Sequence, residues 1–109
     1  MENIKDLLKE QNILNECNHI FQEILIERKR QKQKWEEQNL KSGCNKKKYK
    51  LLSDYFKIVY ETNVKIKQVS WADILLKEIY EALAEDDTVK IKKELIQSAA
   101  IIIAMILNL

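Results

Sequence analysis

The chain contains no proline and a single glycine, Gly43, among its 109 residues. Proline and glycine interrupt helices more strongly than any other residue, so their scarcity favours long, continuous helices. It also excludes a glycine-rich phosphate loop, which needs several glycines to bring backbone amides close to a phosphate. Hydrophobic residues make up 46% and charged residues 33%, a balance typical of a globular domain. The composition therefore predicts an all-α protein, and the length predicts a single domain.

Cysteine and histidine are also scarce, and the few present lack the spacing of a metal or catalytic site. Cys17 and Cys44 form no CxxC pair, and His19 has no partner at zinc-ligand spacing. Free thiols are typical of proteins in a reducing compartment, so we expect a cytoplasmic protein.

No apolar run is long enough to cross a bilayer. Residues 95–109 are uncharged, but they number 15, against roughly 20 for a transmembrane helix. We therefore expect no membrane contact and a buried helix or interface here. Residues 99–106 are apolar around the whole helix, and one neighbouring hairpin cannot cover every side. This pattern predicts a homo-oligomer, a dimer or a tetramer, in which the last helix is largely buried.

The spacing of apolar residues predicts four to five helices arranged as antiparallel hairpins. A long helix over residues 3–39 has one candidate break, near Asn12 and Asn15, with residues 1–17 as an N-terminal extension. Residues 39–48 are polar, contain Gly43 and three lysines, and are expected to form a loop. A helix over residues 49–61 and a connection over residues 62–69 follow.

Two further helices are predicted at the C-terminal end. Ser70 and Asp73 have the spacing of a capping box, which starts a helix over residues 71–84. A short turn follows, in which Asp86 or Asp87 is expected to cap a last helix that ends near Leu107. The short turn requires the two helices to pack antiparallel.

Acidic residues on this hairpin are spaced so that they can converge. Glu78 and Glu81 lie three residues apart, as do Glu94 and Gln97 on the next helix. Carboxylates that converge repel one another, and a hard divalent cation, Mg²⁺ or Mn²⁺, would neutralise them. Without the ion, at least one carboxyl should keep its proton to a higher pH. The alternative is that these residues are solvated, because ExxE is common on helices.

Three blocks of the sequence, taken together, resemble the MazG-like nucleotide pyrophosphohydrolases. Residues 70–83 (SWADILLKEIYEAL) look like the EExxE helix of that family, and residues 94–100 (ELIQSAA) look like its ExxD helix. Residues 27–38 (ERKRQKQKWEEQ) are similar to the ER-x-x-Q-x-x-KWGEQ stretch of small phage and bacterial members. The resemblance covers roughly residues 18–107 and keeps the order of the blocks.

This resemblance implies an all-α fold and Mg²⁺-dependent hydrolysis of a nucleoside triphosphate to the monophosphate and pyrophosphate, in a bacterial or phage-infected cell. It places Glu78, Glu81 and Glu94 at catalytic and metal-ligand positions. Gln97, which replaces the aspartate of ExxD, can still offer a carbonyl oxygen. Lys77 replaces the first acid of EExxE and is either a phosphate-binding cation or a sign that catalysis is lost.

The block from residue 27 to 38 supplies candidate nucleotide-binding residues on one broad helical face: Arg28, Gln31, Lys34, Trp35 and Gln38. An aromatic ring can stack on a base, and cations can reach phosphate. The same tryptophan could instead simply pack against a helix. Glu36 replaces the glycine of WGEQ, which predicts an uninterrupted helix.

Two other functions remain alternatives. A catalytically inactive relative that binds and sequesters a nucleotide or a nucleotide immune signal is favoured by Lys77 and Gln97. A helical interaction protein is favoured by the apolar last helix. The lysines at 46, 47, 48 and 50 form only a short run in a chain of net charge +2, so no nucleic-acid partner is expected.

Overall fold

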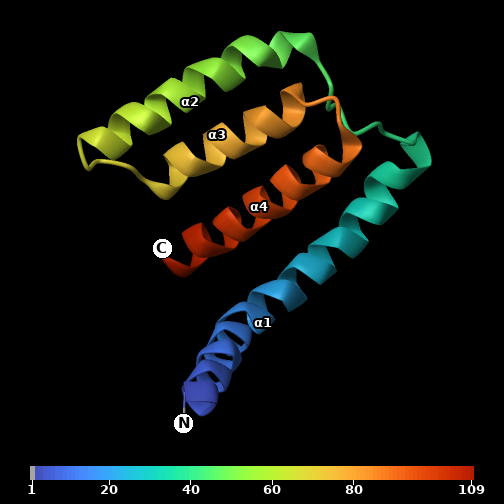
Figure 1. Cartoon of the computed structure of the whole chain (residues 1–109). Coiled ribbons are helices and arrows are strands. Elements are labelled where there is room, and N and C mark those ends of the chain that lie inside the picture. The colour runs from blue at the N-terminus through green and yellow to red at the C-terminus, as the bar shows by residue number, and fades with distance from the viewer. Residues whose placement is uncertain (1) are drawn as a thin grey trace. The chain divides into compact units, whose positions relative to one another are not determined.

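The computed structural model describes residues 2–109 and folds them into helices, with no strand in that range (Figure 1). The α-helices are α1 (Glu2–Trp35), α2 (Lys50–Lys65), α3 (Trp71–Ala84) and α4 (Thr88–Leu107), and the short 3-10 helices are η1 (Glu36–Gln38) and η2 (Lys47–Tyr49). The predicted all-α class is confirmed. Met1, part of the expected N-terminal extension, lies outside the described residues. No helix within the described range is both long and apolar enough to cross a bilayer.

The chain divides after Lys41 into two compact units. Unit 1 ends at Lys41 and contains α1 and η1. Unit 2 extends from Ser42 to Leu109 and contains η2 and the three remaining α-helices. The carboxylate pattern therefore belongs to unit 2, whereas the pattern around Trp35 belongs to unit 1.

Unit 1 is built on one long helix that ends earlier than the sequence predicts. Asn12 and Asn15 do not interrupt α1, because asparagine costs a helix interior only about 0.7 kcal/mol relative to alanine. The predicted uninterrupted helix through Glu36 is wrong. After Trp35 the chain tightens into η1, and Asn39 takes the left-handed conformation (φ 51°) while its amide donates to the carbonyl of Glu36 at 3.0 Å. Asparagine tolerates that conformation better than most residues.

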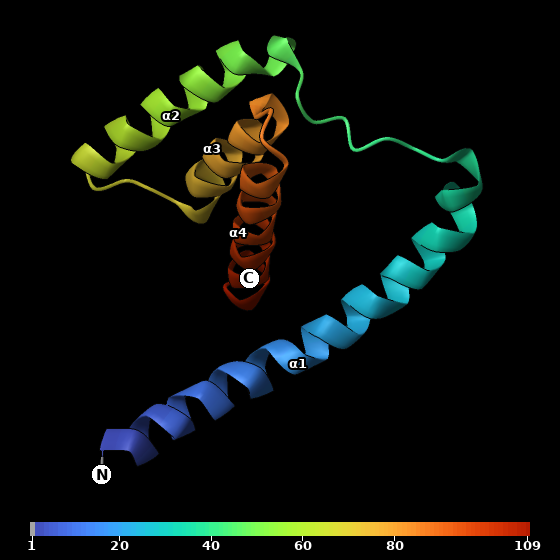
Figure 2. The same ribbon diagram turned by 45° about the vertical axis from the view of Figure 1, so that its right-hand side comes forward.

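Unit 2 places α3 between α2 and α4 (Figures 1 and 2). Helix α2 continues to Lys65, four residues beyond its predicted end, since nothing in residues 62–65 breaks a helix. The predicted capping box is confirmed. Ser70 Oγ accepts from the amide of Asp73 at 3.3 Å, and Asp73 Oδ2 accepts from the amide of Ser70 at 3.0 Å. Asn63 of α2 also donates to Asp73 Oδ2 at 3.0 Å, which ties α2 to the start of α3.

Small and aromatic side chains hold the three helices of unit 2 together. Ala82 of α3 is 0% exposed and Ser98 of α4 is 2% exposed, and small side chains let neighbouring helices approach closely. On the other side of α3, Tyr80 stacks on Phe56 of α2 with the ring centroids 5.0 Å apart. Only Ser98 and Ile101 of α4 are buried within the described chain. The predicted burial of the last helix therefore stays a prediction about an assembly.

Candidate functional site

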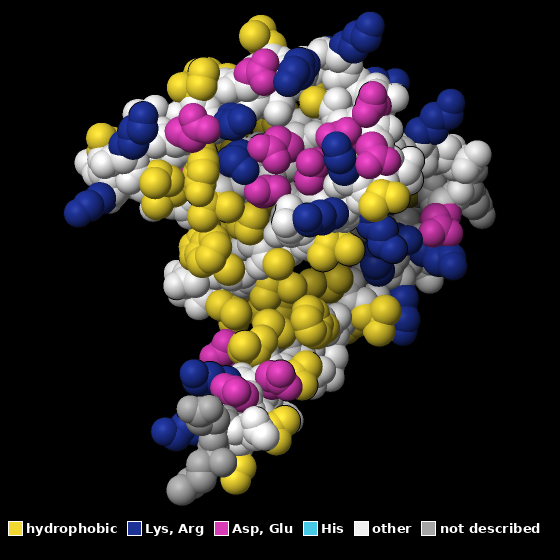
Figure 3. All heavy atoms as spheres, viewed as in Figure 1, with side chains coloured by type: hydrophobic (Ala, Val, Ile, Leu, Met, Phe, Trp, Pro, Cys, Tyr) yellow, Lys and Arg dark blue, Asp and Glu magenta, His cyan; other side chains and the backbone are white. Residues whose placement is uncertain are grey.

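The α3–α4 hairpin brings the predicted carboxylates to one pocket. Its volume is about 280 Å³, and it is lined by Glu78, Glu81, Lys90, Lys93, Glu94 and Gln97. Four of these residues are the predicted metal ligands. They meet because both pairs sit one helical turn apart on helices that pack side by side. Figure 3 shows acidic and basic side chains interleaved on this face of unit 2.

Two lysines of this pocket are missing from the sequence prediction. Lys90 and Lys93 lie four residues and one residue before Glu94 and line the same pocket. Helical spacing could have revealed them, because residues 90, 93, 94 and 97 share one helical face. Their ammonium groups give the pocket cations that can approach a phosphate.

Lys77 is in direct contact with both α3 carboxylates. Its Nζ lies 3.3 Å from Glu78 Oε1 and 3.3 Å from Glu81 Oε1. The Nζ also lies 5.3 Å from the ring centroid of Tyr60 on α2. Partial burial by itself would lower the pKa of Lys77, but attraction to Glu81 and Glu78 outweighs it and raises the pKa. Lys77 therefore stays charged and neutralises much of the negative charge on α3.

Glu94 is the least compensated acid of the pocket. Its Oε2 is buried and has no hydrogen-bond partner among the described residues. Burial raises the pKa of the Glu94 carboxyl, and the negative charges of Glu81, Glu85 and Glu78 raise it further. This is the direction that the sequence predicts for a carboxylate cluster without an ion.

Glu81 and Glu94 also face a second hollow of about 330 Å³ near the α3–α4 turn. Its lining consists of Lys50, Ser53, Glu81, Ala84, Glu85, Asp86 and Glu94. These two glutamates therefore stand between two polar hollows. In this turn, Asp87 occupies the N-cap position of α4 but makes no side-chain capping bond. Instead, the Glu85 carboxylate accepts from the amides of Asp86 and Asp87, at 3.1 Å each.

The donor set fits a hard cation only in part. Carboxylate and amide oxygens are suitable ligands for Mg²⁺, and the unpartnered oxygen of Glu94 has the chemistry of a metal ligand. However, within residues 2–109 no three acidic, histidine or cysteine side chains are arranged as a ready metal site. The ammonium of Lys77 already contacts two of the predicted ligands. The arrangement thus supplies oxygens for one divalent cation more readily than for two.

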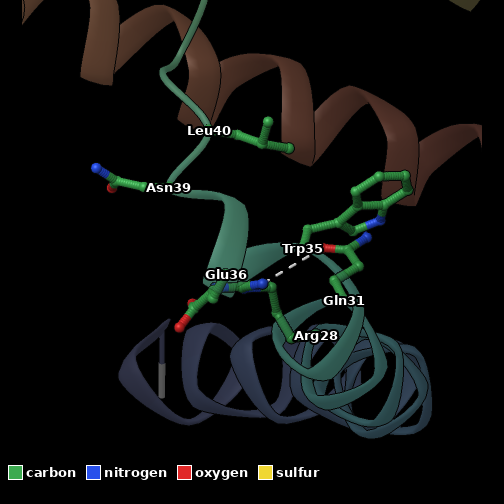
Figure 4. A pocket seen from close by; sticks show the side chains of 6 residues that line it. All are labelled: Arg28, Gln31, Trp35, Glu36, Asn39 and Leu40. Atoms are coloured by element: carbon green, nitrogen blue, oxygen red, sulfur yellow. Dashed lines mark hydrogen bonds and ion pairs between the residues drawn. The ribbon is translucent and has the colours of Figure 1, made fainter.

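Unit 1 carries a separate pocket of about 570 Å³ at the C-terminal end of α1 (Figure 4). Its lining consists of Arg28, Gln31, Trp35, Glu36, Asn39 and Leu40. Arg28 pairs with Glu36 at 3.2 Å and donates to Gln31 Oε1 at 3.4 Å. Three of the predicted nucleotide-binding residues, Arg28, Gln31 and Trp35, therefore meet around one hollow with an exposed indole ring.

The other two predicted nucleotide-binding residues of this region, Lys34 and Gln38, do not line the pocket. Lys34 is not part of the lining, but its Nζ lies 4.8 Å from the ring centroid of Trp35, on which it makes a cation–π contact. Gln38 lies in η1 and is absent from the lining. Glu36, Asn39 and Leu40 were missed, because they reach the pocket only where the chain leaves the α-helical path after Trp35.

No protein-family model, curated protein or solved structure matches this chain. The MazG-like resemblance therefore rests on the three sequence blocks alone.

Proposed function

We propose that this chain is a MazG-like nucleotide pyrophosphohydrolase that uses Mg²⁺, or Mn²⁺, to hydrolyse a nucleoside triphosphate. Water would attack a phosphorus atom and break the anhydride bond between the α- and β-phosphates, which releases the monophosphate and pyrophosphate. The observation that carries this proposal is the pocket on the α3–α4 hairpin, where Glu78, Glu81, Glu94 and Gln97 meet. Such a reaction belongs in the cytoplasm of a bacterial or phage-infected cell.

Each lining residue has a role that its chemistry allows. Glu94, Glu81 and Glu78, with the amide oxygen of Gln97, would hold the cation, which supplies neutralisation of phosphate charge and polarisation of the attacking water. Lys90 and Lys93 would attract the phosphate groups. Because Glu94 has an oxygen without a partner, it is the residue that gains most from a bound cation.

The pocket of unit 1, taken by itself, carries groups that can bind a nucleotide base. Trp35 offers a ring face on which a base can stack, and Gln31 and Asn39 carry amide groups that can hydrogen-bond a base edge. Trp35→Leu should weaken nucleotide binding about tenfold or more, since a stacked base contributes roughly 1–3 kcal/mol. Trp71 lies outside this pocket, so Trp71→Leu is the matched control. Equal binding by the two variants would contradict this role for Trp35.

A second candidate function is a catalytically inactive protein that binds and holds a nucleotide or a nucleotide immune signal. The specific observation in its favour is Lys77, which already neutralises Glu78 and Glu81 and so competes with a catalytic cation. A site with balanced charges can hold a phosphate group without activating water.

One experiment separates the two functions. The protein is incubated with a panel of nucleotides and Mg²⁺, and both the solution and the protein-bound fraction are analysed by mass spectrometry. Monophosphate and pyrophosphate in solution support the enzyme. Glu81→Gln should then abolish them, whereas Glu61→Gln, at an exposed residue that lines neither polar hollow, should not. Retained intact nucleotide supports the sequestering protein. If neither appears, both proposals fail and a helical interaction protein remains.

A further inference from the structure

Lys77 places a positive charge at the position where a metal ion would neutralise the α3 carboxylates. Its Nζ is 3.3 Å from an oxygen of Glu78 and 3.3 Å from an oxygen of Glu81. All three side chains are mostly covered, with exposures of 20% for Lys77, 16% for Glu78 and 28% for Glu81. Ion pairs that are partly shielded from water are stronger than those on an open surface.

The ammonium is also held from the neighbouring helix. The ring of Tyr60 on α2 lies 5.3 Å from Nζ, a distance at which a cation is attracted to an aromatic face. Because the ammonium is covalently tethered to α3, it cannot diffuse away as a dissolved ion can. Glu78 and Glu81 therefore have a permanent counter-ion.

Lysines around the pocket already offset part of its negative charge. Glu78, Glu81 and Glu94 supply three negative charges, and Lys77, Lys90 and Lys93 supply three positive charges. On the α4 side, Glu94 Oε2 is buried and has no hydrogen-bond partner among the described residues. Neither Glu78 nor Glu81 has a buried oxygen without a hydrogen-bond partner in the described range.

We propose that Lys77 is a built-in cation that takes the place of one divalent metal ion, so that this site binds at most one metal ion per chain. The inference rests on the proposed function, because it concerns the same pocket. It predicts that removing the ammonium and adding a carboxylate at position 77 creates a binding site for one additional ion.

The test counts Mn²⁺ ions bound to the full-length protein by electron paramagnetic resonance, with Mn²⁺ alone as the probe. Lys77→Glu should bind one more Mn²⁺ per chain than wild type. Lys57→Glu is the control, because it makes the same charge change in unit 2 at an exposed lysine of α2 that lines neither polar hollow. That control should keep the wild-type number of ions.

A second variant tests the inference independently, in case Lys77→Glu does not fold. Lys77→Met keeps the length of the side chain and removes the charge without adding a ligand, and its Mn²⁺ affinity should rise about tenfold, the order that one adjacent charge produces in ionisation equilibria. Circular dichroism checks that both variants keep their helices.

Several outcomes would overturn the inference: two Mn²⁺ ions in wild type, the same gain in Lys57→Glu as in Lys77→Glu, or no change in either Lys77 variant. A different result would show that the proposed function is wrong while the inference holds. If wild type binds no Mn²⁺ while Lys77→Glu binds one, the inference stands and the metal requirement of the proposed enzyme is wrong.

Discussion

Glu94 shows how one residue can serve a site at the expense of stability. Its buried oxygen has no partner among the described residues, and three other acids lie near enough to raise its pKa. A buried acceptor left unpaired costs about 1–3 kcal/mol. Such a cost is tolerated in folded proteins mainly at functional sites, where a ligand removes it.

Glu94→Gln should therefore stabilise the protein in the absence of metal. Removal of the negative charge should raise the free energy of unfolding by about 1 kcal/mol, which corresponds to roughly 4–8 °C in the melting temperature of a small domain. The measurement is a melting curve in buffer that contains a chelator. Glu61→Gln, on the exposed side of α2, is the control and should leave the melting temperature unchanged. A lower melting temperature for Glu94→Gln would show that its carboxylate is compensated.

Mg²⁺ should stabilise the wild-type protein through the same residues. A ligand that binds only the folded state at 100 times its dissociation constant adds about 2.7 kcal/mol of stability. Glu81→Gln should remove most of this gain, since it deletes a charge at the pocket. Gln97→Asp should enlarge the gain, because a carboxylate is a stronger Mg²⁺ ligand than an amide oxygen. Melting curves with and without Mg²⁺ for the three proteins provide the measurement.

If wild-type protein melts at the same temperature with and without Mg²⁺, both in the presence and in the absence of nucleotide, the metal site is wrong. Nucleotide binding would then depend on the pocket of unit 1 around Arg28 and Trp35. The control for nonspecific salt effects is the same concentration of a monovalent chloride, adjusted to equal ionic strength.

At the scale of elements, the two C-terminal helices begin in different ways. Helix α3 has a complete capping box between Ser70 and Asp73, whereas Asp87 at the start of α4 makes no side-chain capping bond. Ser70→Ala should reduce the free energy of unfolding by about 1 kcal/mol. Asp87→Ala should cost less, because no hydrogen bond is lost. Urea unfolding of the two variants measures the difference, and an equal loss would contradict the assigned caps.

The same capping box predicts how the free energy of unfolding depends on pH. Hydrogen bonds from the amide of Ser70 and from Asn63 lower the pKa of the Asp73 carboxyl. A carboxyl whose pKa is lower in the folded protein contributes stability above its unfolded pKa, and this contribution is lost as pH falls through the folded pKa. Stability should therefore drop below about pH 4, the ordinary pKa of aspartate. Urea unfolding at pH 7 and pH 3 measures the drop, which should be smaller in Asp73→Asn.

At the scale of the whole molecule, apolar side chains of α4 are exposed in the described chain. The exposed residues include Leu95, Ile96, Ile102 and Ile106, and an apolar groove of about 440 Å³ lies along the first half of the helix. Exposed apolar area of this kind is costly in water and is commonly covered by a partner subunit. We expect a homodimer or homotetramer, as the apolar pattern of this helix predicts.

Light scattering at micromolar concentration tests this expectation. Wild type should have the mass of two or four chains, and Ile96→Glu should shift it toward the monomer because it buries a charge in the contact. Val89→Glu is the control, because Val89 is exposed on the same helix but lies outside the groove. A stable wild-type monomer would contradict the predicted oligomer.

The sequence by itself determined the helical class, the ends of α3 and α4, and the spacing that carries Glu78, Glu81, Glu94 and Gln97 to one face. These properties are local: the lack of breakers, a capping box and a helical repeat act within a few residues of each other. Four predicted ligands therefore meet at one pocket.

The tertiary structure alone decided which groups those residues contact. The change from α-helix to 3-10 helix after Trp35 brings Glu36 into the pocket of unit 1, and the packing of α2 places Tyr60 beside Lys77. The Lys77–Glu81 pair follows the i,i+4 helical repeat, so the sequence could have predicted it, whereas the contact of Lys77 with Glu78 depends on side-chain conformations. Such contacts depend on chain turns and rotamers that several elements set together, and no periodicity in the sequence encodes them.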